Sequence, residues 1–280
     1  MRSLLLLIVW IFSSLLFAKQ NHNDTIYIHT ENLADLYALN DKNMQHNLSV
    51  STNLYVLKKQ LANIRFDYMP GKRSLLQMSN NKNICVVNRI KTKARAGKYL
   101  FSKPVNIFLS RRLYQNVSYP ALKPKNSFNH NVLLSELFSE RPNAKVIITA
   151  QISYGDKLDA QIAAIPQDNK VIRHGGEHEV GVMSMFAKGR AEFALLYPHQ
   201  VYESDIEISG RSYTLASIPP YVLGHFMCTN NEVTKEFITS INKYLNSPDN
   251  INELLEIHLN YINPIDQHAI EQFFSQAFVN

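Results

Sequence analysis

The stretch that decides the fold is NICVVNRIKTKARAGKYLFSKP, residues 83–104. It begins with four apolar residues, 84–87, which predict a short buried strand. Polar and mostly cationic side chains follow the strand at Arg89, Lys91, Thr92, Lys93 and Arg95. In α/β proteins, ligands bind at the carboxyl ends of strands, where loops and helix N-termini point their N–H groups. The stretch therefore predicts a site for a small anionic ligand.

Length and charge set the limits of this interpretation. The chain has 280 residues with 45% hydrophobic content, enough for one large domain or two small ones. Its formal net charge is +6, which suits nucleic acid, anionic lipid or an acidic ligand. No Lys/Arg run is longer than Arg111-Arg112, and no basic helix carries interleaved aromatics. We therefore expect no nucleic-acid partner, and a solvated basic surface accounts for most of the charge.

The N-terminus predicts export. Arg2 precedes the apolar run 4–12, and the small residues Ser13, Ser14 and Ala18 follow it. This order is typical of a cleavable secretory signal peptide, here residues 1–18. The run is too short to favour a permanent anchor, although an uncleaved one is the alternative.

The chain has two cysteines, Cys85 and Cys228. In an exported protein an even count favours a disulfide, and this bridge would tie the C-terminal part to the N-terminal part. The alternative is a pair of buried thiols in strands.

The first part of the chain predicts a parallel sheet. Alternation and helical spacing give strand 25–29, helix 54–61, strand 64–68, helix 72–78 and strand 84–87. This β-α-β-α-β order implies right-handed crossovers. Residues 31–47 are predicted to be a polar loop.

A second α/β series follows residues 116–131, which are rich in Pro, Asn, Ser and Lys. It predicts helix 132–138, strand 145–148, helix 157–165, strand 170–172, helix 180–188, strand 193–197 and a strand pair between 205 and 218. Pro219-Pro220 then breaks the pattern, and strand 222–228 and three helices complete the chain.

Together these patterns predict an α/β fold of two lobes joined by a two-strand hinge. Lobe 1 comprises residues 24–108 and 222–280, and lobe 2 comprises residues 109–221. Two crossings between lobes form a hinge with a cleft, which is the usual place for a small ligand.

Four segments carry a family resemblance. They are residues 91–104, with Thr92-x-x-Arg95 and then Phe-Ser-Lys-Pro; Ser153-Tyr154-Gly155 before a helix; residues 189–195, Gly-Arg-Ala-Glu-Phe-Ala-Leu; and residues 224–245. Their order and spacing resemble the type II periplasmic solute-binding proteins, in particular the amino-acid-binding family 3 and its transporter-associated relatives. The resemblance implies a periplasmic, monomeric binding protein without cofactor or catalysis, and with an ABC permease or a sensor kinase as partner. The alternative is a non-transport interaction protein of the same fold whose cleft is degenerate.

The resemblance also implies residue roles. Arg95 matches the arginine that binds a ligand carboxylate, a task that suits a guanidinium, and the Thr92 hydroxyl would assist it. Tyr197 falls where the family has an acidic residue for the ligand ammonium. A tyrosine cannot neutralise a cation at neutral pH, which argues against a standard α-amino acid. An organic acid, peptide fragment, aromatic or sugar-derived ligand is equally open. The other side chains expected to line the cleft are Tyr68, Arg73, Ser153 and Tyr154.

Rival chemistries have weaker support. His174 and His178, with neighbouring glutamates, form a possible zinc motif. Gly175-Gly176 breaks the helix that would place both histidines on one face, so we expect no metal site. No Gly-x-Ser-x-Gly nucleophile elbow is present, and nothing points to an enzyme.

Overall fold

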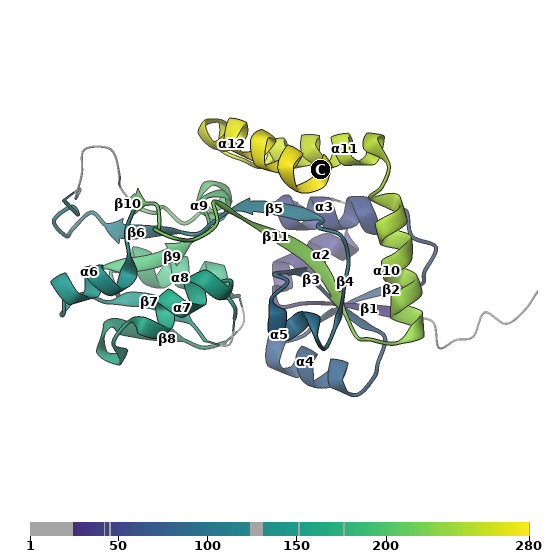
Figure 1. The fold of residues 1–280 in the computed structure, drawn as a ribbon, viewed down its shortest axis with the longest axis horizontal. Helices are drawn as coiled ribbons and strands as arrows, with labels where there is room; N and C mark the ends of the chain where they lie inside the picture. The colour runs from purple at the N-terminus through teal and green to yellow at the C-terminus, as the bar shows by residue number, and fades with distance from the viewer. Residues whose placement is uncertain are drawn as a thin grey trace, which may run out of the picture.

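The computed structural model describes residues 25–41, 43–44, 46–123, 131–150, 152–175 and 177–279. Their helices and strands form two lobes with the strands β5 and β11 running between them (Figure 1). The predicted signal peptide, residues 1–18, lies outside the described residues. No helix within these ranges is both long and apolar enough to cross a membrane.

Lobe 1 is built on the predicted parallel unit. Strands β1 (Ile26–Thr30), β2 (Ile64–Tyr68) and β3 (Ile84–Arg89) pair in parallel with β1 in the centre. Alternate β1 residues, Ile26 and Ile28, are buried in the core. The helices that connect and follow these strands are α2 (Leu33–Asn40), α3 (Leu48–Leu57), α4 (Gly71–Ser79) and α5 (Lys93–Ala96). The three predicted strands and the two predicted helices are therefore confirmed in their order, and α2 is an additional helix between β1 and β2.

The predicted loop at residues 31–47 is wrong, because it contains helix α2. The side chain of Asn32 accepts hydrogen bonds from the N–H groups of Ala34 and Asp35, which caps the helix. Ala38 and Leu39 then bury one face. The prediction followed the polar composition of the segment and overlooked the capping residue.

Lobe 2 has its own sheet and core. The strand order is β10-β6-β9-β7-β8. The strands are β6 (Arg112–Asn116), β7 (Val146–Thr149), β8 (Lys170–Arg173), β9 (Phe193–Leu196) and β10 (Gly210–Tyr213). The helices are α6 (Leu134–Glu140), α7 (Asp156–Ala164), η2 (Gln167–Asn169), α8 (His178–Ala187) and α9 (Pro198–Glu203).

The strand pair predicted between residues 205 and 218 is wrong. That segment supplies β10 alone, whose partner is the unpredicted β6. Strand β6 is hard to recognise because Gln115 is completely buried within it. Its amide donates a 2.7 Å hydrogen bond to Glu192, which compensates the burial.

The two lobes are connected by paired strands. Strand β5 (Asn106–Leu109) lies antiparallel to the first half of β11 (Tyr221–Cys228). The second half of β11 returns to the lobe 1 sheet beside β3 and β4 (Leu100–Phe101). The remaining elements pack on lobe 1 (Figure 1): α10 (Glu232–Tyr244), α11 (Pro248–Asn260), α12 (Pro264–Phe274) and η3 (Ser275–Val279). The two-lobed fold with a two-strand hinge is confirmed.

The disulfide between Cys85 and Cys228 is also confirmed. The two residues face each other on the antiparallel strands β3 and β11, with a Cα–Cα distance of 4.0 Å. Because they are 143 residues apart in sequence, the bond joins the first and last parts of lobe 1.

Candidate functional site

A cavity of about 170 Å³ lies between the lobes. Both lobes and the hinge line it: Ser49, Asn88, Arg89, Ile90, Arg95, Phe108, Arg111, Ile152, Ser153, His178, Glu179, Tyr197, His199, Gln200, Val222, Leu223 and Gly224. The volume is below the roughly 300–1,000 Å³ of pockets for drug-sized ligands, so the cavity suits a small molecule.

Arg95 lines the cavity from the short helix α5, in the middle of residues 83–104. The hydroxyl of Thr92 caps α5 by accepting from the Arg95 N–H at 3.4 Å. The Arg95 guanidinium donates to the Ile90 carbonyl at 3.1 Å. Burial lowers the pKa of Arg95, and the nearby charge of Arg89 adds to this. Within the described residues Arg95 forms no ion pair, so a bound anion would stabilise its charge.

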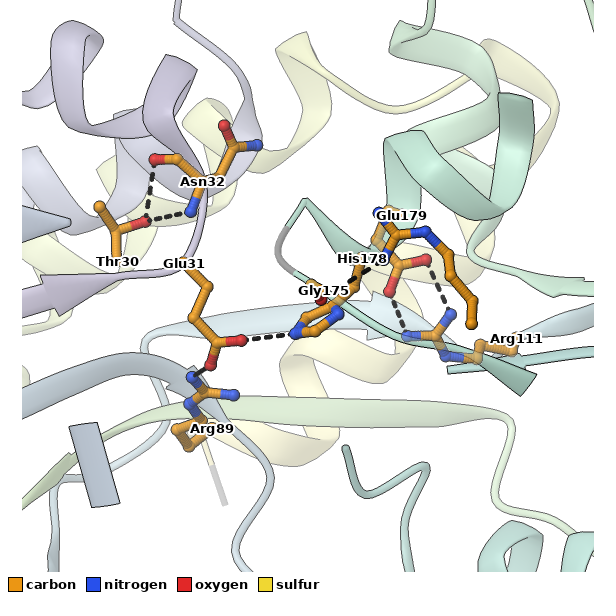
Figure 2. Close-up of polar contacts among 9 residues, drawn as sticks. Thr30, Glu31, Asn32, Arg89, Arg111, Gly175, His178 and Glu179 are labelled. Carbon is orange, nitrogen blue, oxygen red and sulfur yellow. Dashed lines mark hydrogen bonds and ion pairs between the residues drawn. The ribbon is translucent and has the colours of Figure 1, made fainter. Parts of the chain in front are cut away.

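Glu31 links the two lobes across the cleft (Figure 2). It follows β1, and its carboxylate accepts hydrogen bonds from Arg89 of lobe 1 and, at 2.5 Å, from Nε2 of His178 of lobe 2. Burial acts to raise the pKa of Glu31. The His178 hydrogen bond and the Arg89 charge outweigh it and lower that pKa to about 2. At neutral pH Glu31 is therefore ionised, and its carboxylate is bonded to both Arg89 and His178.

Arg111 and Glu179 form a second, bidentate ion pair. Figure 2 shows the Glu179 carboxylate facing the guanidinium, with N–O distances of 2.8 and 2.5 Å. The Arg111 guanidinium carbon lies 4.0 Å from the ring centroid of Tyr197 and 4.8 Å from that of Tyr154. Burial acts to lower the pKa of Arg111, but the charge of Glu179 outweighs it and raises that pKa. Arg111 is therefore a permanently charged, buried cation.

Several buried polar atoms around the cavity have no hydrogen-bond partner. In the described part of the chain, four such atoms belong to cavity-lining residues: Arg111 Nε, His178 Nδ1, His199 Nδ1 and Gln200 Oε1. Burial lowers the pKa of His199 to about 3, so its imidazole is neutral. Because most buried polar groups in proteins are hydrogen-bonded, this concentration points to a bound polar ligand or to water.

The sequence-predicted residues are only partly brought together. The cavity lining contains three of them: Arg95, Ser153 and Tyr197. Tyr154 is not in this lining; its ring centroid lies 4.8 Å from the Arg111 guanidinium carbon, and its hydroxyl accepts from the Thr149 N–H at 2.8 Å. Thr92 acts as a helix cap and does not line the cavity. Tyr68, at the end of β2, and the exposed Arg73 on α4 do not line it either.

The predicted site residues left out eight charged or polar members of the lining: Ser49, Asn88, Arg89, Arg111, His178, Glu179, His199 and Gln200. Arg89 had been noted in the cationic segment but was given no role of its own. His178 and Glu179 stood in a motif considered only for metal binding. In the described residues no group of three or more His, Cys, Asp or Glu side chains is arranged to hold a metal ion. The position of Arg111, directly after the predicted boundary between the lobes at residues 108 and 109, was the available clue to a cleft residue.

No protein-family model matches the chain, and no curated protein matches its sequence. Solved structures do match. One is the probable amino-acid ABC transporter extracellular-binding protein ytmK from Bacillus subtilis, at 17% identity and TM-score 0.55, covering 86% of this chain and 98% of that one. An ancestral arginine-binding protein bound to arginine matches at 14% identity and TM-score 0.58, covering 87% and 100%. The chain has the type II periplasmic-binding-protein fold.

A third match has a different role. A histidine kinase sensor domain with similarity to periplasmic binding proteins aligns at 11% identity and TM-score 0.61, covering 86% of this chain and 98% of that one. At such low sequence identities the matches establish the fold of this chain. The ligands named for the matched proteins are not thereby assigned to it. The expected resemblance is confirmed at this level, and most of the matched structures are binding proteins rather than enzymes.

A half-buried carboxyl beside the cleft predicts pH-dependent stability. Glu203, at the end of α9 in lobe 2, accepts from the Leu48 N–H at 3.0 Å at the start of α3 in lobe 1. Burial raises the pKa of Glu203 to about 7, and the charge of Asp35 adds to this. A raised pKa means that the folded state binds a proton that the unfolded state releases, so stability falls as the pH rises from about 4.5 through 7.

We therefore expect Glu203→Gln to remove part of the pH dependence. One pKa unit corresponds to about 1.4 kcal/mol, and partial contact with water reduces the total to about 2 kcal/mol. Urea unfolding at pH 5 and pH 8 measures this, with Glu207→Gln, an exposed carboxylate, as the control. If Glu203→Gln loses as much stability between the two pH values as the wild type, the assignment is wrong.

Proposed function

We propose that this chain is an exported solute-binding protein that closes on a small, carboxylate-bearing ligand for ABC-type uptake or signalling. The observation that carries the proposal is Arg95, a half-buried cation without an ion-pair partner in the described residues, at a cavity with unbonded polar atoms. A carboxylate would supply the missing charge and accept a bidentate pair of hydrogen bonds.

We expect the two lobes to close on the ligand because the cavity lies between them. Residues of lobe 1, such as Arg95, and of lobe 2, such as Ser153, line the same space. A ligand that contacts both lobes binds the closed state selectively and shifts the population toward it. We place the lobe boundaries for this motion at residues 24–108 and 222–280 for lobe 1 and 109–221 for lobe 2.

The proposed location and partners rest on two supports. The Cys85–Cys228 disulfide suits an oxidising compartment such as the periplasm. The matched structures include ABC transporter binding proteins and a kinase sensor domain. We propose a permease or a sensor kinase as the membrane partner, and a chain that acts as a monomer, without cofactor and without catalysis.

A second candidate is an interaction protein of the same fold with a degenerate cleft. The contact between Glu31 and His178 favours it, because the lobes are already joined by the protein's own side chains. In that case closure would be the resting state and a lobe surface would bind the membrane partner.

A ligand screen of the wild type separates the two candidates, and Arg95→Ala tests whether Arg95 binds the ligand. We expect at least one compound among amino acids, organic acids and sugars to raise the unfolding midpoint of the wild type. A ligand at 100 times its Kd stabilises by about 2.7 kcal/mol. Losing a charged hydrogen bond of about 2 kcal/mol should weaken binding about 30-fold in the variant.

Arg65→Ala, an exposed arginine on β2, is the matched control and should bind as the wild type does. A complete absence of hits would favour the interaction protein. A hit that binds Arg95→Ala normally would exclude Arg95 as the carboxylate site, and turnover of any hit would make the protein an enzyme.

A further inference from the structure

The surroundings of Arg111 resemble those of a bound cationic ligand. The guanidinium lies close to the rings of Tyr154 and Tyr197, and its edge meets the Glu179 carboxylate through two hydrogen bonds. Only 6% of the side chain is exposed. Aromatic faces and a bidentate carboxylate are the groups that attract a free guanidinium or ammonium. The protein has filled this part of the cleft with its own side chain.

This arrangement leaves no carboxylate for a cationic group on a ligand. Among the described residues that line the cavity, Glu179 is the only acidic one, and both of its oxygens bond Arg111. Glu31, which bonds two residues of the lining without lining the cavity itself, is occupied by Arg89 and His178. A buried ammonium without a partner is strongly unfavourable, so a ligand that carries one would bind poorly.

Donors for an anion are present in the same space. Arg95 has no ion-pair partner in the described part of the chain, and the buried Nε–H of Arg111 has no acceptor. The neutral imidazole of His199 is 5% exposed and its Nδ1 is unbonded, so this atom is a donor in the tautomer that carries the proton on Nδ1. These groups come from lobe 1 and from lobe 2, so one anion could contact both lobes.

We propose that Arg111 is a tethered cation that occupies the cation-binding part of the cleft, so that the cleft selects a small carboxylate lacking an ammonium group. The inference rests on the proposed solute-binding function and narrows its ligand class. Arg111 is then a specificity-determining residue. It occupies the Glu179 carboxylate, so that Glu179 cannot bind a cationic group of a ligand, and the site keeps a net positive charge.

Arg111 also lies between the cavity and a neighbouring groove. Together with Tyr197 it lines both the 170 Å³ cavity and an adjoining, more apolar groove of about 560 Å³. Leu158, Ile218 and Tyr221 belong to the groove alone. Shortening Arg111 would therefore leave a space bounded by two tyrosine rings and a free carboxylate. Small molecules bind engineered cavities of complementary chemistry.

The wild-type protein tests ligand class directly. Propionate and alanine, succinate and aspartate, and glutarate and glutamate are pairs that differ by the ammonium group. We expect thermal-shift and calorimetric titrations to show the member without the ammonium binding at least about tenfold tighter, or about 1.4 kcal/mol. Equal or tighter binding of the amino member would overturn the inference. If no pair binds, the proposed solute-binding function fails instead, and the variant below decides the role of Arg111.

Arg111→Ala tests the tethered cation itself, with methylguanidinium chloride at low millimolar concentration as the probe. We expect methylguanidinium to raise the unfolding midpoint of Arg111→Ala but not of the wild type or of Arg111→Ala/Glu179→Gln, with sodium chloride as the salt control. If Arg111→Ala does not fold alone, the yield of refolding with methylguanidinium against sodium chloride replaces the midpoint. No rescue, or equal rescue without the Glu179 carboxylate, would overturn the inference.

Discussion

Replacing Cys85 and Cys228 by alanine is expected to lower the free energy of unfolding by about 5 kcal/mol. The bond closes a loop between residues 143 positions apart, and the chain-entropy relation gives about 5 kcal/mol for a loop of that length. Both cysteines are completely buried on facing strands, so the bridge fixes the pairing of β3 with β11. Because β11 also pairs with β5 in the connection between the lobes, losing the bridge weakens the attachment of that connection to lobe 1.

Urea unfolding followed by circular dichroism measures this effect, with reduced wild type as the matched control because it keeps both sulfur atoms. The reduced protein and the double variant should unfold at similar midpoints, well below that of the oxidised protein. Oxidised and reduced protein unfolding at the same midpoint would contradict the prediction. Two freely alkylated thiols in the native protein would show that the bridge is not formed.

The parts of the fold that the sequence predicted are those whose pattern is local. The strands β1, β2 and β3 alternate or carry continuous apolar residues, and their pairing follows from the helices between them. Strand β6 was not predicted because its buried Gln115 is stabilised by Glu192, a partner 77 residues away. A polar residue in a core can be recognised only once that partner is known.

The candidate site follows the same rule. Arg95 stands in a short motif whose cap, Thr92, is three residues away, and the motif alone placed it in the cleft. Arg111 and Glu179 are 68 residues apart, and Glu31 and His178 are 147 apart. Their roles depend on the approach of two lobes, so each residue by itself looked like an ordinary surface charge or a metal ligand.

Glu179→Ala is expected to destabilise the protein by about 4 kcal/mol. Arg111 is 6% exposed, and removing its only carboxylate partner in the described residues leaves a buried charge uncompensated. Breaking a buried pair in this way costs about 3–5 kcal/mol. Glu232→Ala, which removes the partner of Lys235 in a solvent-exposed pair at 3.9 Å, is the control and should cost less than about 1 kcal/mol.

A double variant shows whether the loss comes from the unpaired charge. Arg111→Met/Glu179→Leu replaces both partners with apolar side chains, and such replacements of buried pairs are often neutral or stabilising. The double variant should therefore be more stable than Glu179→Ala in urea unfolding, although it carries one more substitution. If it were less stable, the packing of Arg111 between Tyr154 and Tyr197, rather than its charge, would dominate the site. In that case the tyrosine rings would hold the guanidinium without Glu179, and methylguanidinium would rescue Arg111→Ala/Glu179→Gln as well as Arg111→Ala.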